Sequence, residues 1–206
     1  MPAKADGGLF HVRLTFVEPL LGTVPKDPKV YQTYIAGLSP NVEATLDEEV
    51  ATVPSASEEE KGWTGFHTED GQPFIYDYSI KGFFKDACSM LTRAGGTESA
   101  KLKAFRKCID GLVFVRPRKI VIVVKGDLFR LERPLRAQTA QGERIALSRS
   151  DAAPIGSSVE FDVEILGGVS QLVLAEWLDY GEHRGLGQWR NGGYGSFTYT
   201  MEKRVR

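Results

Sequence analysis

The sequence predicts a mixed α+β fold in which single strands alternate with helices. Residues 9–16 and 158–166 alternate strictly between apolar and polar side chains, which is typical of strands with one buried face. Two further segments, 80–91 and 170–180, carry apolar residues at the three- and four-residue spacing of amphipathic helices. With 206 residues, of which 42% are hydrophobic, the chain is long enough for one large globular domain or two small ones.

The first half of the chain begins with the 9–16 strand, whose apolar face carries Phe10, Val12, Leu14 and Phe16. A proline-rich segment without periodicity follows, with a candidate short helix at 30–36. Asp70-Gly71 predicts a turn into a short strand at 73–76. We expect Ser79 to cap the next helix, because its hydroxyl can accept a backbone N–H. The apolar stripe of this helix consists of Ile80, Phe83, Phe84, Ala87 and Leu91. A second helical stretch begins at Thr97, and its apolar stripe consists of Leu102, Phe105 and Ile109.

The second half is predicted to contain strands at 112–124, interrupted at Pro117, and at 158–166. Residues 126–156 read as irregular and basic, with a short strand at 145–148. The helix over 170–180 has a stripe of Leu172, Leu174 or Ala175, and Leu178. A final alternating strand begins at Phe197.

This β-α-β-β-α-β order predicts a ferredoxin-like core, the topology that RNA-recognition motifs also have. We interpret residues 1–206 as a single domain with two insertions. Residues 18–72 form an acidic, partly mobile insertion, and residues 126–157 a basic one. RNA-recognition motifs bind RNA on the open sheet face. The acidic outward face of the 158–166 strand argues that RNA does not cover the whole sheet here.

Charge is distributed unevenly, although the formal net charge is only −1. Residues 41–70 carry nine acids and one base, which we interpret as a solvated face. Residues 111–150 carry nine bases and three acids, a composition that favours a polyanionic partner. No apolar run approaches the ~20 residues needed to span a bilayer, and no apolar signal-peptide core is present. We therefore expect a cytoplasmic protein without membrane contact. Cys88 and Cys108 lack metal-ligand spacing and are expected to be reduced, and we expect neither a metal nor a cofactor.

A glycine cluster near the end of the chain is the strongest candidate for a binding site. Within residues 185–195, five glycines free the backbone for positive φ and for close approach to a ligand. Arg184 and Arg190 supply cations, and Trp189 and Tyr194 supply flat rings on which bases can stack. A Rossmann phosphate loop follows a strand and opens a helix, whereas this cluster follows a helix, so a dinucleotide site is disfavoured. The alternative is a glycine-rich connection that binds nothing.

Three motifs in this order resemble the RAMP superfamily, the RNA-binding backbone and repeat-processing proteins of CRISPR effector complexes. The first is Ser79-Ile80-Lys81-Gly82, which is similar to the family's helix-opening motif. The second is Arg133-Pro-Leu-Arg136 with Arg149 and a Pro154-Ile-Gly-Ser turn, which resembles its basic hairpin or thumb. The third is the glycine cluster, so that the resemblance spans about residues 8–201. The chain is short for such a backbone subunit, and Tyr78 departs from the motif.

The resemblance implies a protein that holds a single-stranded or guide-like RNA, with other subunits of a ribonucleoprotein of antiviral defence as further partners. The expected RNA-binding residues are Lys81, Arg133, Arg136, Arg144, Arg149, Arg184, Gly185, Gly187, Trp189, Arg190, Gly192, Gly193, Tyr194 and Gly195.

We expect binding rather than catalysis, and two alternatives stay open. The resemblance allows a metal-independent endoribonuclease of the repeat-processing type, for which His183 and Asp27 are the weak catalytic candidates. The other alternative is a protein- or nucleotide-binding module that acts within or against a nucleic-acid defence system.

Overall fold

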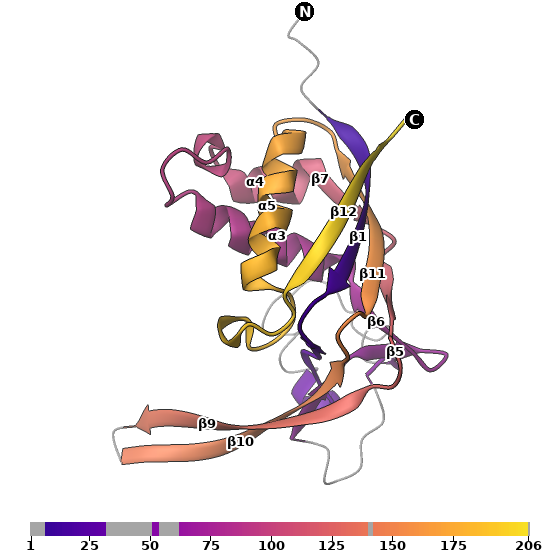
Figure 1. Ribbon diagram of the computed structural model, residues 1–206, viewed down its shortest axis with the longest axis vertical. Coiled ribbons are helices and arrows are strands. Elements are labelled where there is room, and N and C mark those ends of the chain that lie inside the picture. Colours follow the sequence, from indigo (N-terminus) through magenta and orange to yellow (C-terminus); the bar gives the residue numbers. More distant parts are fainter. Residues whose placement is uncertain (1–6, 32–50, 54–61, 140–141, 206) are drawn as a thin grey trace, which may run out of the picture.

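The computed structural model describes residues 7–31, 51–53, 62–139 and 142–205, except for the side chains of 135–139 and 143–146. It is a mixed α+β structure, as the sequence predicts, and it has two sheets. Helices α3 (Asp77–Leu91), α4 (Phe105–Leu112) and α5 (Gln171–Arg184) gather on one side of the larger sheet (Figure 1). Within the described part of the chain, no helix is long and apolar enough to cross a bilayer.

The larger sheet is centred on β1 (Gly8–Phe16), which pairs antiparallel with β12 (Phe197–Arg204) on one side and β11 (Ser158–Ile165) on the other. Beyond β11 lie β7 (Val113–Arg116) and β8 (Lys119–Val123), then β6 (Gln72–Tyr76) and β5 (His67–Glu69). The predicted break at Pro117 separates β7 from β8, because proline cannot donate a ladder hydrogen bond. Asp70 and Gly71 form the predicted turn, both at positive φ.

The core lies between this sheet and the helices, where the apolar faces predicted for β1 and β11 are buried. Ile80, Phe83, Phe84 and Ala87 of α3 pack there, also as predicted, while Leu91 is partly buried. Burial of each such large side chain stabilises the fold by about 1.5–3 kcal/mol.

Two helix details differ from the expectation. The predicted Ser79 cap is wrong, because α3 already begins at Asp77 and Tyr76 occupies the N-cap without a side-chain hydrogen bond. Ser170 instead caps α5, where its Oγ accepts a hydrogen bond from the Val173 N–H at 3.3 Å. Leu172 was placed in the apolar stripe of α5 but is exposed, whereas Trp177, on the same helix, is fully buried.

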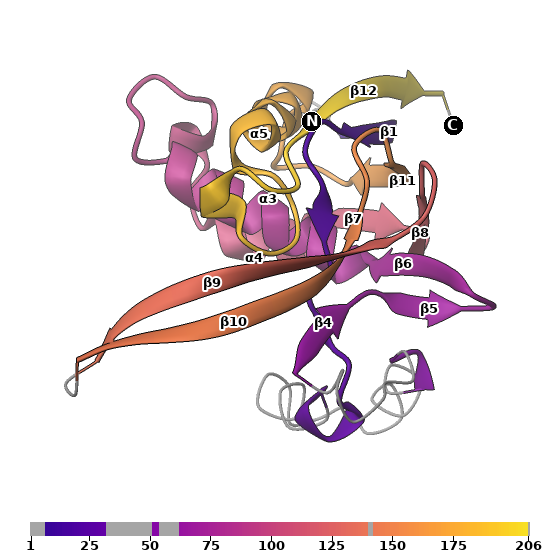
Figure 2. The same ribbon diagram turned by 60° about the horizontal axis from the view of Figure 1, so that its bottom comes forward.

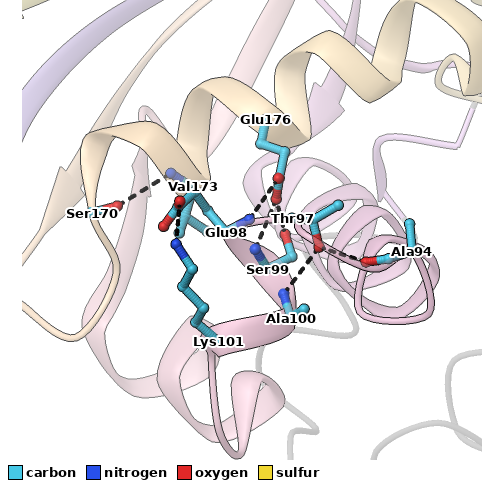
Figure 3. A network of polar contacts seen from close by, with 9 residues as sticks. All are labelled: Ala94, Thr97, Glu98, Ser99, Ala100, Lys101, Ser170, Val173 and Glu176. Atoms are coloured by element: carbon cyan, nitrogen blue, oxygen red, sulfur yellow. Dashed lines mark hydrogen bonds and ion pairs between the residues drawn. The ribbon is translucent and has the colours of Figure 1, made fainter.

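Glu176 of α5 joins that helix to the connection between α3 and α4 (Figure 3). Its carboxylate accepts hydrogen bonds from the backbone N–H groups of Glu98 and Ser99, both at 2.8 Å, and from the Ser99 hydroxyl. These N–H groups open the short 3-10 helix η2 (Ser99–Lys101), so an anion there satisfies donors that would otherwise be unpaired. The Trp177 indole N–H also donates to the Ser99 Oγ, at 3.0 Å.

The second sheet contains a long hairpin, β9 (Phe129–Thr139) and β10 (Gly142–Ala153), that projects away from the core (Figure 2). Short strands β2 (Leu20–Leu21), β3 (Val24–Pro25) and β4 (Trp63–Gly65) complete it against the base of β10. The irregular structure expected for 126–156 is therefore wrong. The alternation that marks a strand arises from one buried face, and none of the described β9 side chains from Phe129 through Pro134 is fully buried.

Residues 32–50 and 54–61 of the acidic insertion, which the sequence predicts to be partly mobile, lie outside the described residues. Of the helix expected at 30–36, only residues 30–31 are described, and they are helical. Thr52 and Val53 are described and buried, and the Thr52 carbonyl accepts a hydrogen bond from the Thr68 N–H at 2.9 Å. Cys88 is buried and Cys108 half-buried, and both are free thiols.

Candidate nucleic-acid interface

The glycine loop, residues 185–195, joins α5 to β12, and three of its glycines are required by close backbone packing. A Cβ at Gly185 would lie 2.5 Å from the Tyr194 carbonyl oxygen, and one at Gly195 would overlap the Leu186 carbonyl. A Cβ at Gly187 would lie 2.5 Å from the Leu21 carbonyl oxygen of β2. All three also have positive φ, so these glycines shape the loop rather than face a ligand.

The chain that follows β1 holds the glycine loop in place through backbone hydrogen bonds. The Gly195 N–H donates to the Pro19 carbonyl at 2.9 Å, and the Val17 N–H donates to the Ser196 carbonyl at 2.9 Å. The side chain of Gln188 lies within 3.4 Å of the Thr64 and Ser150 hydroxyls of the second sheet. The loop is therefore fixed on both sheets before any ligand binds.

The remaining two glycines, Gly192 and Gly193, lie on the open side of the loop, opposite Arg133 of the hairpin. The Arg133 guanidinium is 5.0 Å from the ring centroids of both Trp189 and Tyr194. Its Nη1 is close enough to Gly192 that a Cβ there would approach it to 3.2 Å. Gly193 has a φ of +87°, and a Cβ at this position would meet no atom within 4 Å. Within the described part of the chain, no carboxylate pairs with Arg133.

Arg184 and Arg190 share one acid, Asp86 of α3. Their guanidinium groups lie 3.1 Å and 2.8 Å from the same carboxylate oxygen, and Arg184 also donates to the Asn191 side chain. Together with Arg133, Trp189 and Gly192 they line an open cleft of about 570 Å³. Three arginines and one carboxylate leave this cleft with an excess of positive charge, which suits a phosphate.

Arg149, another predicted RNA contact, faces the other side of the hairpin. It pairs with Glu132 at 3.2 Å, and its guanidinium lies 5.4 Å from the Trp63 ring centroid. Arg130 and Lys26 lie over the same ring, at 4.7 Å and 5.8 Å. In the register of β9 and β10, Arg149 opposes Glu132, the residue next to Arg133, so that Arg149 and Arg133 occupy opposite faces.

The other predicted cations are not brought to the cleft by any described contact. Arg136 and Arg144 lie on the outer hairpin, and their side chains are outside the described residues. Lys81 of α3 points toward α4, where its ammonium donates to the Asp110 carbonyl at 3.1 Å and lies 5.4 Å from the Phe114 ring centroid.

Neither catalytic candidate is part of an arrangement for acid–base chemistry. Asp27 uses its carboxylate to accept a hydrogen bond from the Lys29 N–H at 2.9 Å, as in a helix-starting turn. His183 is exposed in the last turn of α5 and is absent from the described lining of the cleft. Among the described residues, no group of three or more His, Cys, Asp or Glu side chains is arranged to hold a metal ion.

His67, whose place in a polar turn predicts an exposed side chain, is instead buried in the wall of a second cavity. Its ring nitrogens contact the Thr52 hydroxyl at 2.9 Å and the Tyr31 hydroxyl at 3.3 Å, and it stacks on Phe74. Burial lowers the pKa of His67 from its ordinary value of 6.5 to about 4, so the ring is neutral at physiological pH. This burial could not be predicted from the sequence, because Tyr31 and Thr52 are far from His67 along the chain.

The open face of the larger sheet, where RNA-recognition motifs bind RNA, is occupied by internal ion pairs. His11 and Arg204 contact Asp162 at 2.8 Å and 3.3 Å, and Arg13 pairs with Glu160 at 3.2 Å. The charged side chains of this face therefore already have partners on neighbouring strands.

The fold is similar to that of a chain in the cryo-EM structure of the Type III-B Cmr-beta bound to cognate target RNA. The TM-score is 0.52 at 14% identity, and the match covers 96% of this chain and 61% of that chain. The protein thus spans less than two thirds of the length of that subunit of a CRISPR effector complex. No protein-family model and no curated protein matches the sequence. At this identity the likeness is one of fold alone.

Proposed function

We propose that this protein binds single-stranded or guide-like RNA in the cleft between the glycine loop and the β9–β10 hairpin, as a divergent relative of the RAMP superfamily. The observation that carries the proposal is the position of Arg133, whose guanidinium lies against Trp189 and Tyr194 beside Arg184 and Arg190. Cations and aromatic rings at one open site suit a phosphate backbone with bases attached.

The strand order supports a ferredoxin-like core for this proposal. Strands β12, β1, β11 and β7 are adjacent and antiparallel in that order, and α3, α4 and α5 supply the two helical crossovers. In this interpretation residues 18–72 and 126–157 are insertions into a single domain. The hairpin in the second insertion and the glycine loop of the core meet at the cleft.

The proposed contacts are mostly independent of base sequence. Arg133, Arg184 and Arg190 are placed to contact phosphates, whereas the amide N–H groups of Gly192 and Gly193 already donate to the Trp189 and Arg190 carbonyls, at 2.8 Å and 3.0 Å. We also propose that the protein acts within a ribonucleoprotein of antiviral defence, since the chain with a similar fold belongs to an effector complex bound to target RNA.

The proposal is tested by the salt dependence of RNA binding, measured by fluorescence anisotropy with a 20-nucleotide single-stranded RNA. We expect Arg133→Ala with Arg190→Ala to lower affinity at least tenfold and to reduce the slope of log K against log salt by about one unit or more.

The matched control is Arg13→Ala with Arg204→Ala, which removes the same charge from the open sheet face. We expect its affinity and slope to equal those of the wild type. Equal losses from both pairs would show that only net charge matters, and no loss from the first pair would remove the cleft as the RNA site.

A further inference from the structure

A second cavity of about 430 Å³ lies next to the RNA cleft and shares two lining residues with it, Gly187 and Arg190. Its walls come from β2 and β3, from β5 and β6, from the first turns of α3 and from the start of the glycine loop. The cleft and the cavity are thus neighbours that meet at Gly187 and Arg190 of the glycine loop.

The walls of this cavity are mainly apolar and aromatic, with few polar groups. Phe66, Phe74 and Tyr76 are buried in its interior. Tyr78 is stacked on Tyr76, with ring centroids 5.2 Å apart and planes 16° apart, and 44% of Tyr78 stays exposed. Small-molecule pockets have this composition, an apolar and aromatic lining with a few polar groups that orient the ligand.

The polar groups and charges of the lining limit what the cavity can hold. Ser79 and Arg190 offer hydrogen-bonding groups, and His67 contributes no charge because its buried ring is neutral. No carboxylate is among the described lining residues. A flat, uncharged ring with hydrogen-bonding edges fits such walls better than a phosphate or a cation does.

We propose that this cavity receives one unpaired nucleobase of the RNA whose backbone lies in the cleft, so that the protein detects a base as well as phosphates. The inference rests on the proposed function, because the phosphates in the cleft bring the nucleotide to Arg190. A base that turns past Arg190 gains an aromatic surface on Tyr78 and leaves water.

Gly82 of α3 provides a test that leaves the cleft intact. It lines the cavity, and a Cβ at this position meets no atom within 4 Å. Gly82→Leu therefore fills part of the cavity without a clash and improves helix propensity. Gly111→Leu is the matched control, because Gly111 also lies in a helix, α4, with open space around it, but does not line the cavity.

Two RNA probes separate base binding from backbone binding: a 12-nucleotide oligoadenylate and an abasic ribose-phosphate strand of the same length. We expect Gly82→Leu to weaken oligoadenylate binding about tenfold, the usual size of one base-stacking contact, and to leave abasic binding within twofold. Gly111→Leu should change neither affinity. Circular dichroism checks that both variants fold, and Tyr78→Ala replaces Gly82→Leu if that variant does not.

Undiminished oligoadenylate binding by a folded Gly82→Leu protein overturns the base pocket, and so does an equal loss for both probes. Failure of the proposed function gives a different result, because the wild-type protein then binds neither probe.

Discussion

Two surfaces of this protein carry arginines, and they differ in what the arginines contact. On the open sheet face, Arg13 and Arg204 each pair with a carboxylate of β11. In the cleft, Arg133 lies on aromatic rings, while Arg184 and Arg190 share the single carboxylate of Asp86. A guanidinium that already pairs with a carboxylate must give up that contact to bind a phosphate, so the net free energy gained on binding is small. The partners of the arginines, rather than their number, therefore distinguish a surface suited to RNA.

The largest effect is expected where the shape of the cleft is changed through its glycines. Gly195→Val places a side chain on the Leu186 carbonyl, so we expect a loss of about 4 kcal/mol or more in stability and no RNA binding.

Gly193→Val places its side chain in open space, so only the backbone strain at positive φ lowers stability, by roughly 1–3 kcal/mol. We expect it to fold but to bind at least tenfold more weakly, because the loop no longer admits a phosphate. Circular dichroism melts and anisotropy titrations measure both, and a folded Gly193→Val protein with wild-type affinity would exclude this loop from the interface.

Acidic pH should affect the region beside the cleft through His67. Its pKa is about 4 in the folded protein and 6.5 in the unfolded chain, so the unfolded chain binds the proton first as pH falls. We expect a loss of about 2–3 kcal/mol of stability from this group between pH 7 and pH 4. Urea unfolding across this range should show a shallower pH dependence for His67→Gln, with His183→Gln as the control for losing a histidine. Identical slopes for wild type and His67→Gln would contradict the assignment.

Asp86 partly neutralises the positive charge of Arg184 and Arg190 in the cleft. Its removal should increase the difference in RNA affinity between the cleft and the sheet face. Asp86→Asn should raise RNA affinity about fivefold at low salt, since one unit of negative charge beside two guanidinium groups is lost. The salt slope should steepen as well. Asp162→Asn, which releases His11 and Arg204 on the sheet face, should leave the affinity unchanged. An equal gain from both variants would mean that the RNA does not distinguish the two surfaces.

The smallest effect is expected from the ion pairs of the sheet face themselves. Arg204→Ala removes an exposed pair with Asp162 and should change the free energy of unfolding by less than about 1 kcal/mol. Thermal melts at low and high salt measure this change. A substantially larger loss would show that these charges hold the sheet together and would weaken their use as a control.

The strands and helices that bury one face could be predicted from the sequence. The alternation in β1 and β11 and the apolar spacing in α3 correspond to buried side chains, and Pro117 marks a real break. The hairpin was missed because its exposed strands carry no such alternation. The parallel pairing of Trp63 with Arg149 joins residues far apart in the chain, and strands of two or three residues have no detectable period.

The sequence also identified the residue types of the candidate site but not their partners. The glycine loop and Arg133 could be singled out by composition, and the structure brings them together. Asp86 could not, since an acid in an amphipathic helix resembles any solvent-facing residue. The division of the glycines into three that are tightly packed and two that are not depends on contacts with β2 and with the loop itself.

Backbone hydrogen bonds join the chain after β1 to the end of the glycine loop, from Val17 and Glu18 to Ser196 and from Gly195 to Pro19. They have a consequence for protein engineering. A graft of residues 185–195 into another scaffold would lose the Pro19 carbonyl that receives the Gly195 N–H and the Leu21 backbone on which Gly187 rests. The transplantable unit is therefore discontinuous. It consists of the loop together with residues 17–22, and a recipient must offer two neighbouring antiparallel strands to carry both pieces.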